Sequence, residues 1–245
     1  MKKRNGFTLV EILIGIVVGV ISIAALFFTY ETFNKAFKTV EAKSTMNSNA
    51  RDALSLMARE IRNTGRVDTN WLGDDSPLSS YQYIEKYSSK SGYKSGTDYL
   101  RVLYDDSAQA RVEVGYGLKK YSNSSEYYLA RTFKIKQCTA PNSCSYVINN
   151  TDQIFINNVE DLQVVLKDHN GNEVSPVNST TQAAKDNQAN VKSIEIYLVL
   201  RSGNKIYSSS KDWQVKNSGN TYTKKDQYHR DSFFVSIYPR NIVKN

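Results

Sequence analysis

The hydrophobic pattern divides the chain into three stretches, and the first is the most apolar. From Phe7 to Phe28 the side chains are almost all apolar, and Glu11 is the only charged one. A helix of this length, at about 1.5 Å rise per residue, spans roughly 33 Å, enough to cross a hydrocarbon core of about 30 Å. The basic residues 2–4 precede it, which predicts that this end stays in the cytoplasm and the remainder lies outside.

In the second stretch, apolar side chains recur at steps of three and four, the spacing of one helix face. This seam runs through Phe33, Phe37, Val40, Leu54, Met57 and Ile61, with the polar Ser44 and Asn47 between them. No proline precedes Pro77, so we predict one helix from Phe7 to about Asn63, with Gly65 as its C-terminal stop. We expect the seam to face the head of the same chain, in preference to a partner helix.

After Asp98 the period changes to two, which is typical of strands with one buried face. The expected strands are 99–104, 111–116, 129–135, 153–158, 162–167, 194–201 and 232–238. The pattern therefore predicts an α+β fold: a long N-terminal helix, transmembrane in its first half and amphipathic in its second, packed on an antiparallel β-sheet head.

Two stretches lack a sustained period and are predicted to be irregular. Residues 66–98 are rich in Tyr, Ser, Gly and Asp and are expected to form a connection. Their tyrosines are equally consistent with a loop packed onto the helix and sheet and with an exposed surface that stacks on bases. Residues 174–190 are small and polar, so we expect an exposed loop. Residues 168–173 place Asn-Gly between strand-like segments, which predicts a hairpin turn. A calcium loop is the weaker interpretation, because its glycine would stand one position later.

Length and charge narrow the class of protein. A chain of 245 residues is long enough for one anchor helix and one globular head. The formal net charge is +8, but residues 2–4 supply three of the 32 basic side chains, which leaves 29 against 24 acidic ones, or +5. Because the basic residues are scattered, a solvated surface is favoured over a dedicated nucleic-acid face.

Two cysteines, Cys138 and Cys144, lie either side of a short loop. A zinc site is disfavoured, because the distant His169 and His229 make no recognised ligand spacing with them. If the head lies outside the cytoplasm, we predict a disulfide, which would contribute about 2 kcal/mol because the loop is short.

The sequence offers no recognisable catalytic motif: no Gly-rich phosphate loop, no neighbouring Cys/His pair and no nucleophile elbow. Adjacent acids such as Asp105 and Asp106 point to opposite faces when they stand on a strand. Carboxylates from separate segments can still converge in a fold. We expect neither enzymatic activity nor a cofactor or bound metal.

Glu11 needs a partner, because a carboxylate near the bilayer centre costs on the order of 2 to 3 kcal/mol, and less toward an interface. Cleavage after Gly6 would give Phe7 an amine one helical turn from Glu11. The stretch GFTLVEILIGIVVG, which begins at Gly6, resembles the type IV prepilin signature. The resemblance implies cleavage between Gly6 and Phe7 by a prepilin peptidase, N-methylation of Phe7 and retention of the helix. The alternative is an ordinary secretory signal, with a mature chain that starts at Ala25.

Weaker resemblances extend along the chain. Four segments resemble parts of PilW-like minor pilins and of the related J-type minor pseudopilins of type II secretion. Residues 50–66 resemble the end of their helix, and residues 159–174 resemble a strand that enters a turn. Residues 191–202 resemble the long strand that follows, and residues 229–241 resemble the final strand. Residues 66–97 and the cysteine loop have no counterpart in that pattern. The implied type IV pilin-like organisation is a leader at 1–6, a transmembrane half-helix at 7–28, an amphipathic half-helix at 29–64 and a periplasmic head at 65–245.

The implied function is that of a minor type IV pilin that primes or caps pilus assembly at the filament tip. The implied partners are prepilin peptidase, other minor and major pilins and the inner-membrane assembly platform. Phe7 and Glu11 of neighbouring subunits would neutralise each other as a helix joins the bundle. The protein would start in the bacterial inner membrane and end in the pilus at the cell surface. The alternatives are a J-type pseudopilin of a type II secretion system and a tip protein that binds DNA or a surface.

Overall fold

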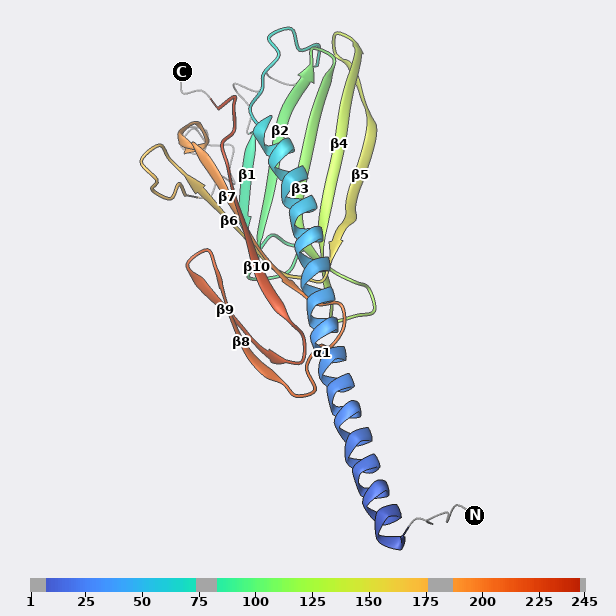
Figure 1. The fold of residues 1–245 in the computed structure, drawn as a ribbon. Helices are drawn as coiled ribbons and strands as arrows, with labels where there is room; N and C mark the ends of the chain where they lie inside the picture. Colours follow the sequence, from blue (N-terminus) through green and yellow to red (C-terminus); the bar gives the residue numbers. More distant parts are fainter. Residues whose placement is uncertain (1–7, 74–82, 176–186, 243–245) are drawn as a thin grey trace.

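The computed structural model describes residues 8–73, 83–175 and 187–242, where one long helix joins a head of three antiparallel sheets (Figure 1). The elements are α1 (Leu9–Arg62), β1 (Ile84–Ser88), β2 (Asp98–Ser107), β3 (Ala110–Lys120), β4 (Tyr127–Ala140), β5 (Ser143–Asn157), β6 (Val159–Lys167), β7 (Ser193–Arg201), β8 (Lys211–Asn217), β9 (Asn220–Asp226) and β10 (Arg230–Ile237). The predicted α+β fold is confirmed.

Helix α1 runs without a break for 54 residues. Its start follows from Thr8, which is extended (φ −77°, ψ 153°) and caps the helix, so the helix begins two residues later than predicted. Its end follows from Gly65, whose φ of 78° lies in the left-handed region. The Gly65 N–H donates to the carbonyl of Leu103 at 3.1 Å, which ties the helix end to the sheet. The predicted stop is therefore confirmed.

The face that α1 turns toward the head differs from the predicted seam. The last three apolar positions of that seam are buried and the first three are exposed: Leu54, Met57 and Ile61 against Phe33, Phe37 and Val40. Ser44 and Asn47 are exposed as well. Burial begins instead at Met46 and continues through Ala50 and Ala53, whose small side chains let the helix approach the head closely. The prediction of one continuous seam was wrong, because the head covers only the second part of the helix.

The larger sheet has five strands in the order β1-β2-β3-β4-β5, each antiparallel to its neighbours. The strands predicted at 99–104, 111–116, 129–135 and 153–158 are found in β2, β3, β4 and the end of β5. Strand β1 was missed, because its five residues include Glu85 and Lys86 and show no clear alternation. The stretch predicted to be irregular therefore contributes an edge strand.

The second sheet has three strands in the order β10-β7-β6, and it confirms the last three predicted strands. The polar hairpin β8–β9 was missed, because its strands carry few apolar side chains. The sequence feature that could have predicted this hairpin is the Ser218-Gly219 pair in its turn. Both residues have positive φ, the conformation that a tight two-residue hairpin requires.

One apolar core joins α1 to both larger sheets. Inward-facing side chains of the five-stranded sheet, of the three-stranded sheet and of α1 form a single cluster, which includes Met57, Ile61, Leu100, Val114, Leu162 and Ile196. Because strand side chains alternate between faces, the other face of the five-stranded sheet points away from α1. That outer face carries charged side chains such as Arg101, Glu113 and Lys134.

A buried carboxylate links α1 to the five-stranded sheet. Glu60, only 5% exposed, accepts hydrogen bonds from the Tyr116 hydroxyl and the Arg131 guanidinium. Burial, reinforced by the charge of Glu60, raises the pKa of Tyr116 well above its usual value, so the phenol keeps the proton that it donates.

The two predicted loops have different outcomes. The Asn-Gly turn is confirmed: the Asp168 carboxylate accepts hydrogen bonds from the N–H groups of Asn170 and Asn172 at 2.8 and 2.9 Å. The exposed loop at 174–190 is wrong at Gln188, which is 2% exposed and accepts the N–H of Tyr83 at 3.0 Å. This bond satisfies a backbone amide next to the start of β1, the edge strand of the five-stranded sheet among the described residues. Residues 176–186 lie outside the described residues.

The corrected seam predicts unequal effects of two truncations in α1. Met57→Ala removes a fully buried side chain and is expected to lower the free energy of unfolding of the head by about 2–5 kcal/mol. Phe37→Ala removes a 68% exposed side chain and should change it by no more than about 0.5 kcal/mol. Urea unfolding of the full chain in detergent, followed by near-UV circular dichroism, measures both. Equal destabilisation would contradict the corrected seam.

Candidate functional site

The N-terminal half of α1 projects away from the head (Figure 1). From Leu9 to Phe28 every large apolar side chain is more than half exposed, and we refer to this segment as the apolar stem. The helix is long and apolar enough to cross a membrane. An exposed apolar surface of this extent marks an interaction with lipid or with other helices. The apolar stem is therefore the first candidate functional surface.

Glu11 is the single charge on the apolar stem and lies in its first turn. Its carboxylate accepts hydrogen bonds from the Thr8 N–H and the Thr8 hydroxyl, both at 2.9 Å, and its own N–H donates to the Thr8 hydroxyl at 3.3 Å. This arrangement is a capping box, which satisfies amides that the helix start leaves free. Both bonds to the carboxylate end on Oε2, so Oε1 has no hydrogen-bond partner among the described residues.

The role of Thr8 was missed at the sequence level, although Thr8-Leu9-Val10-Glu11 fits the capping-box pattern. The predicted processing residues, Gly6 and Phe7, lie outside the described residues. Thr8 is the residue that caps the helix start, and the helix begins at Leu9. The bond predicted to be cleaved, between Gly6 and Phe7, therefore precedes the cap by one residue in the sequence. Within the described residues, the cap of the helix start is supplied by Thr8 and Glu11.

The cysteine loop lies at the other end of the molecule. Cys138 and Cys144 are joined by a disulfide across the β4–β5 hairpin, with their Cα atoms 4.0 Å apart. This hairpin turn is at the end of the head far from the N-terminus (Figure 1). Two hydrogen bonds tie it to neighbouring loops: the Cys138 N–H donates to the Gln109 carbonyl and the Asn142 N–H to the Leu72 carbonyl, each at 2.8 Å. The disulfide thus closes a tip built from three loops.

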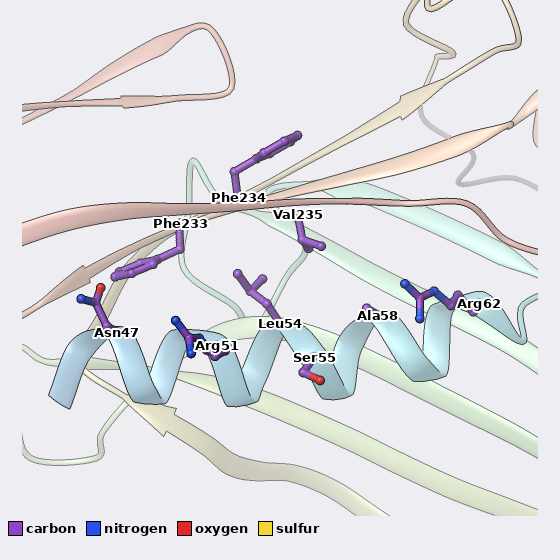
Figure 2. A pocket seen from close by; sticks show the side chains of 9 residues that line it. All are labelled: Asn47, Arg51, Leu54, Ser55, Ala58, Arg62, Phe233, Phe234 and Val235. Carbon is purple, nitrogen blue, oxygen red and sulfur yellow. The ribbon is translucent and has the colours of Figure 1, made fainter. Parts of the chain in front are cut away.

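A groove of about 580 Å³ separates α1 from the edge strand β10 (Figure 2). In Figure 2 Phe233 and Val235 point toward the helix and Phe234 points away from it. Leu54 rises from the helix between the arginines 51 and 62 and faces Val235. The groove combines an apolar floor with two basic side chains, and no carboxylate lines it among the described residues.

The head shows no arrangement suited to metal binding in the part of the chain that the structure describes, where no cluster of three or more His, Cys, Asp or Glu side chains is found. The adjacent acids of β2 point to opposite faces as predicted: Asp105 is buried and receives Arg111 at 2.7 Å, whereas Asp106 is exposed. Neither cysteine is a free thiol. The sequence-predicted residues are therefore not brought together: Glu11 and the disulfide stand at opposite ends of the molecule.

Comparison with known proteins identifies one segment. Residues 1–27 match the family model of the prokaryotic N-terminal methylation motif. The matched segment contains Gly6, Phe7 and Glu11 and indicates a type IV prepilin-like protein. Comparisons with curated proteins and with solved structures found no match. The motif and the apolar stem together support membrane anchoring. The matched segment does not extend into the head.

The tip disulfide generates a stability prediction. The double variant Cys138→Ala, Cys144→Ala is expected to lower the free energy of unfolding by about 2 kcal/mol, because the closed loop is short. Urea unfolding of the full chain under oxidising conditions measures the difference from wild type. Dithiothreitol should lower the stability of the wild type to that of the variant and leave the variant unchanged. No loss in the wild type with dithiothreitol, or an equal loss in the double variant, would contradict the assignment.

Proposed function

We propose that this chain is a minor type IV pilin that primes or caps pilus assembly at the filament tip together with other minor pilins. The observation that carries the proposal is the apolar stem, left bare by the head and bearing one carboxylate in its first turn. A soluble helix would bury such a surface in its own domain. The N-terminal methylation motif supports a type IV pilin or pseudopilin, and the tip role is our own step beyond it.

The positions of the resembling segments support the choice of a PilW-like subtype. Residues 159–174, 191–202 and 229–241 contain β6, β7 and β10, which form one sheet although long stretches of chain separate them. Residues 50–66 contain the end of α1 that packs beside this sheet. Four weak resemblances therefore fall on one continuous part of the structure.

The mechanism starts with removal of residues 1–6 by prepilin peptidase and N-methylation of the new amine on Phe7. The head lies outside the inner membrane while the apolar stem stays within it. As the assembly platform adds a helix to the bundle, the Phe7 amine of one subunit pairs with Glu11 of its neighbour. Glu11 can do so without losing its cap, since Oε2 binds Thr8 and Oε1 binds no other described residue. In a medium of low dielectric constant, this pairing offsets the cost of burying either charge.

Removing the carboxylate of Glu11 tests this mechanism. Glu11→Ala should be processed and membrane-bound, but its incorporation into filaments should fall about tenfold or more. The reason is that the Phe7 amine would lose its partner, and an unpaired charge inside a bilayer costs about 2.5 kcal/mol. Immunoblots of sheared pili against the membrane fraction measure incorporation. The matched control is Glu31→Ala, an exposed carboxylate on the same helix that pairs with Lys35 at 3.2 Å beyond the apolar stem. This control should assemble normally.

Two results would revise the proposal in different ways. Normal assembly of Glu11→Ala would show that charge pairing does not guide the helix into the bundle. If deletion of the chain left surface pili intact but stopped the release of secreted proteins, the chain would be a J-type pseudopilin with the same stem mechanism.

A bulky residue at the predicted cleavage site tests the processing step. Gly6→Trp should retain residues 1–6, because a large side chain replaces the small one next to the bond. The control Asn5→Ala changes the neighbouring position and should be cleaved. Intact mass of the membrane-bound chain distinguishes the two forms. Loss of residues 1–6 in Gly6→Trp would move the cleaved bond elsewhere, and a mature chain that starts at Ala25 would indicate an ordinary secretory signal.

A further inference from the structure

A polar pocket of about 370 Å³ lies on the outer face of the five-stranded sheet, within the size range of about 300–1,000 Å³ that is usual for ligand sites. Its floor and walls include Lys90, Tyr93, Tyr99, Arg101, Glu113 and Asp152. The neighbouring positions of β2 and β3, such as Leu100 and Val114, belong to the core shared with α1. The pocket therefore opens on the side of the sheet away from the helix.

Two glycines of β3 make room for the aromatic floor. A Cβ atom at Gly115 would overlap the Tyr99 hydroxyl, and one at Gly117 would overlap the rings of Tyr93 and Tyr99. Glycine inside a strand weakens the sheet, so two of them on one face need a reason. Here they let two tyrosine rings, with centroids 4.8 Å apart, lie against the sheet.

The carboxylates of the pocket are held in fixed positions by cations. Arg101 donates to Glu85 at 2.9 Å and to Glu113 at 3.2 Å. Glu113 also pairs with Lys134 at 3.3 Å. Planar carboxylates fixed in this way can accept hydrogen bonds from hydroxyl groups without rearranging.

Asp152 is placed in the pocket by an irregularity of β5. Its φ of 54° is unusual for a residue other than glycine, and it lies where the register of β4 and β5 shifts. Its carboxylate accepts the Tyr93 hydroxyl at 2.6 Å and the Lys119 ammonium at 2.5 Å. Burial opposes the charge of Asp152, but these hydrogen bonds prevail and lower its pKa. Bulges of this kind often redirect a side chain at a functional site.

Lys90 is the exception in this network. Its ammonium lies 3.6 Å from the centre of the Tyr99 ring, and no carboxylate is within ion-pair distance of it in the described part of the chain. Burial lowers the pKa of Lys90, an effect that the charge of Glu85 only partly offsets. The lining holds three cations, Lys90, Arg101 and Lys134, and three acids, Glu85, Glu113 and Asp152. Because Asp152 is already paired with Lys119 from outside the lining, and Arg101 and Lys134 hold the other two acids, a negative charge on a ligand would find its partner in Lys90.

We propose that this pocket binds a sugar ring that bears one carboxylate, such as a uronic acid unit of a surface polysaccharide. Lys90 would pair with the sugar carboxylate, while Asp152, Glu113 and the Tyr93 hydroxyl bind the ring hydroxyls. An apolar face of the sugar ring would contact the half-buried Tyr93 ring, because Lys90 covers the ring of Tyr99. The proposal concerns what the head recognises, and it stands apart from the assembly role of the apolar stem.

Two other ligand classes fit the pocket less well. A nucleic-acid strand requires a continuous positive groove, whereas three carboxylates stand among the cations here. A divalent metal would have to displace Arg101 or Lys119 from the carboxylates that they already hold.

Calorimetric titration of the full chain in detergent tests the proposal. The probes are sodium D-glucuronate, D-glucose as the same ring without a carboxylate, and sodium acetate as a carboxylate without a ring. Glucuronate should bind saturably and about tenfold more tightly than either comparator, because only it makes both the charged and the hydroxyl contacts. Lys90→Gln should weaken its binding about tenfold, and Lys90→Arg, which keeps the charge, should retain it.

The matched control is Lys120→Gln, an exposed lysine at the end of β3 outside the pocket. It should leave the affinity for glucuronate unchanged, and near-UV circular dichroism should be the same for all variants. Any of four results would overturn the proposal: equal affinity for glucose, equal affinity for acetate, no effect of Lys90→Gln, or no saturation up to about 50 mM, well above the millimolar range of a weak site. Displacement of glucuronate by single-stranded DNA at low salt would point to nucleic acid instead.

Discussion

The structure depends on how the end of α1 is fixed to the five-stranded sheet, and Glu60 is at the centre of that attachment. Its carboxylate lies in the core, where an uncompensated charge would be strongly unfavourable, and Tyr116 and Arg131 provide the compensation. Breaking a buried pair of this kind typically costs about 3–5 kcal/mol, more than most single contacts. Met57 and Ile61 flank Glu60 and face the core, whereas Phe33 and Phe37 lie on the part of the helix that the head does not cover.

Sequence periodicity was sufficient for the architecture but not for the limits of burial. Alternation of apolar and polar residues predicts strands with one buried face, such as 111–116, and a long apolar run without proline predicts a helix. The hairpin β8–β9 has only Trp213, Val215 and Tyr222 as large apolar or aromatic side chains, which is too few for a sustained alternation. The exposed Phe33 carries the same helical signal as the buried Met57, because the period reports a shared face and not what covers that face. Only the tertiary structure shows where the head ends.

The candidate sites also differ in how far the sequence alone could predict them. Glu11 was visible because a single charge in an apolar run is conspicuous, and Thr8 could have been found from its spacing to Glu11. The outer-face pocket could not, because Glu85, Arg101 and Asp152 come from different strands and meet only through strand register. The segments with a resemblance to minor pilins form the three-stranded sheet beside α1, whereas the outer-face pocket lies on the five-stranded sheet, which includes stretches without a counterpart.

The length of helix left uncovered has a consequence for the height at which the head is held. The first residue of α1 that lines a hollow shared with the head is Lys38. The helix before it, from Leu9 to Phe37, measures about 44 Å at 1.5 Å per residue. If the apolar stem spans a bilayer core of about 30 Å, roughly 14 Å of helix remains between that core and the head. The helix is unbroken here, so this length would act as a rigid spacer, with the hairpin β8–β9 on the side of the head nearer the apolar stem and the β4–β5 turn on the far side (Figure 1).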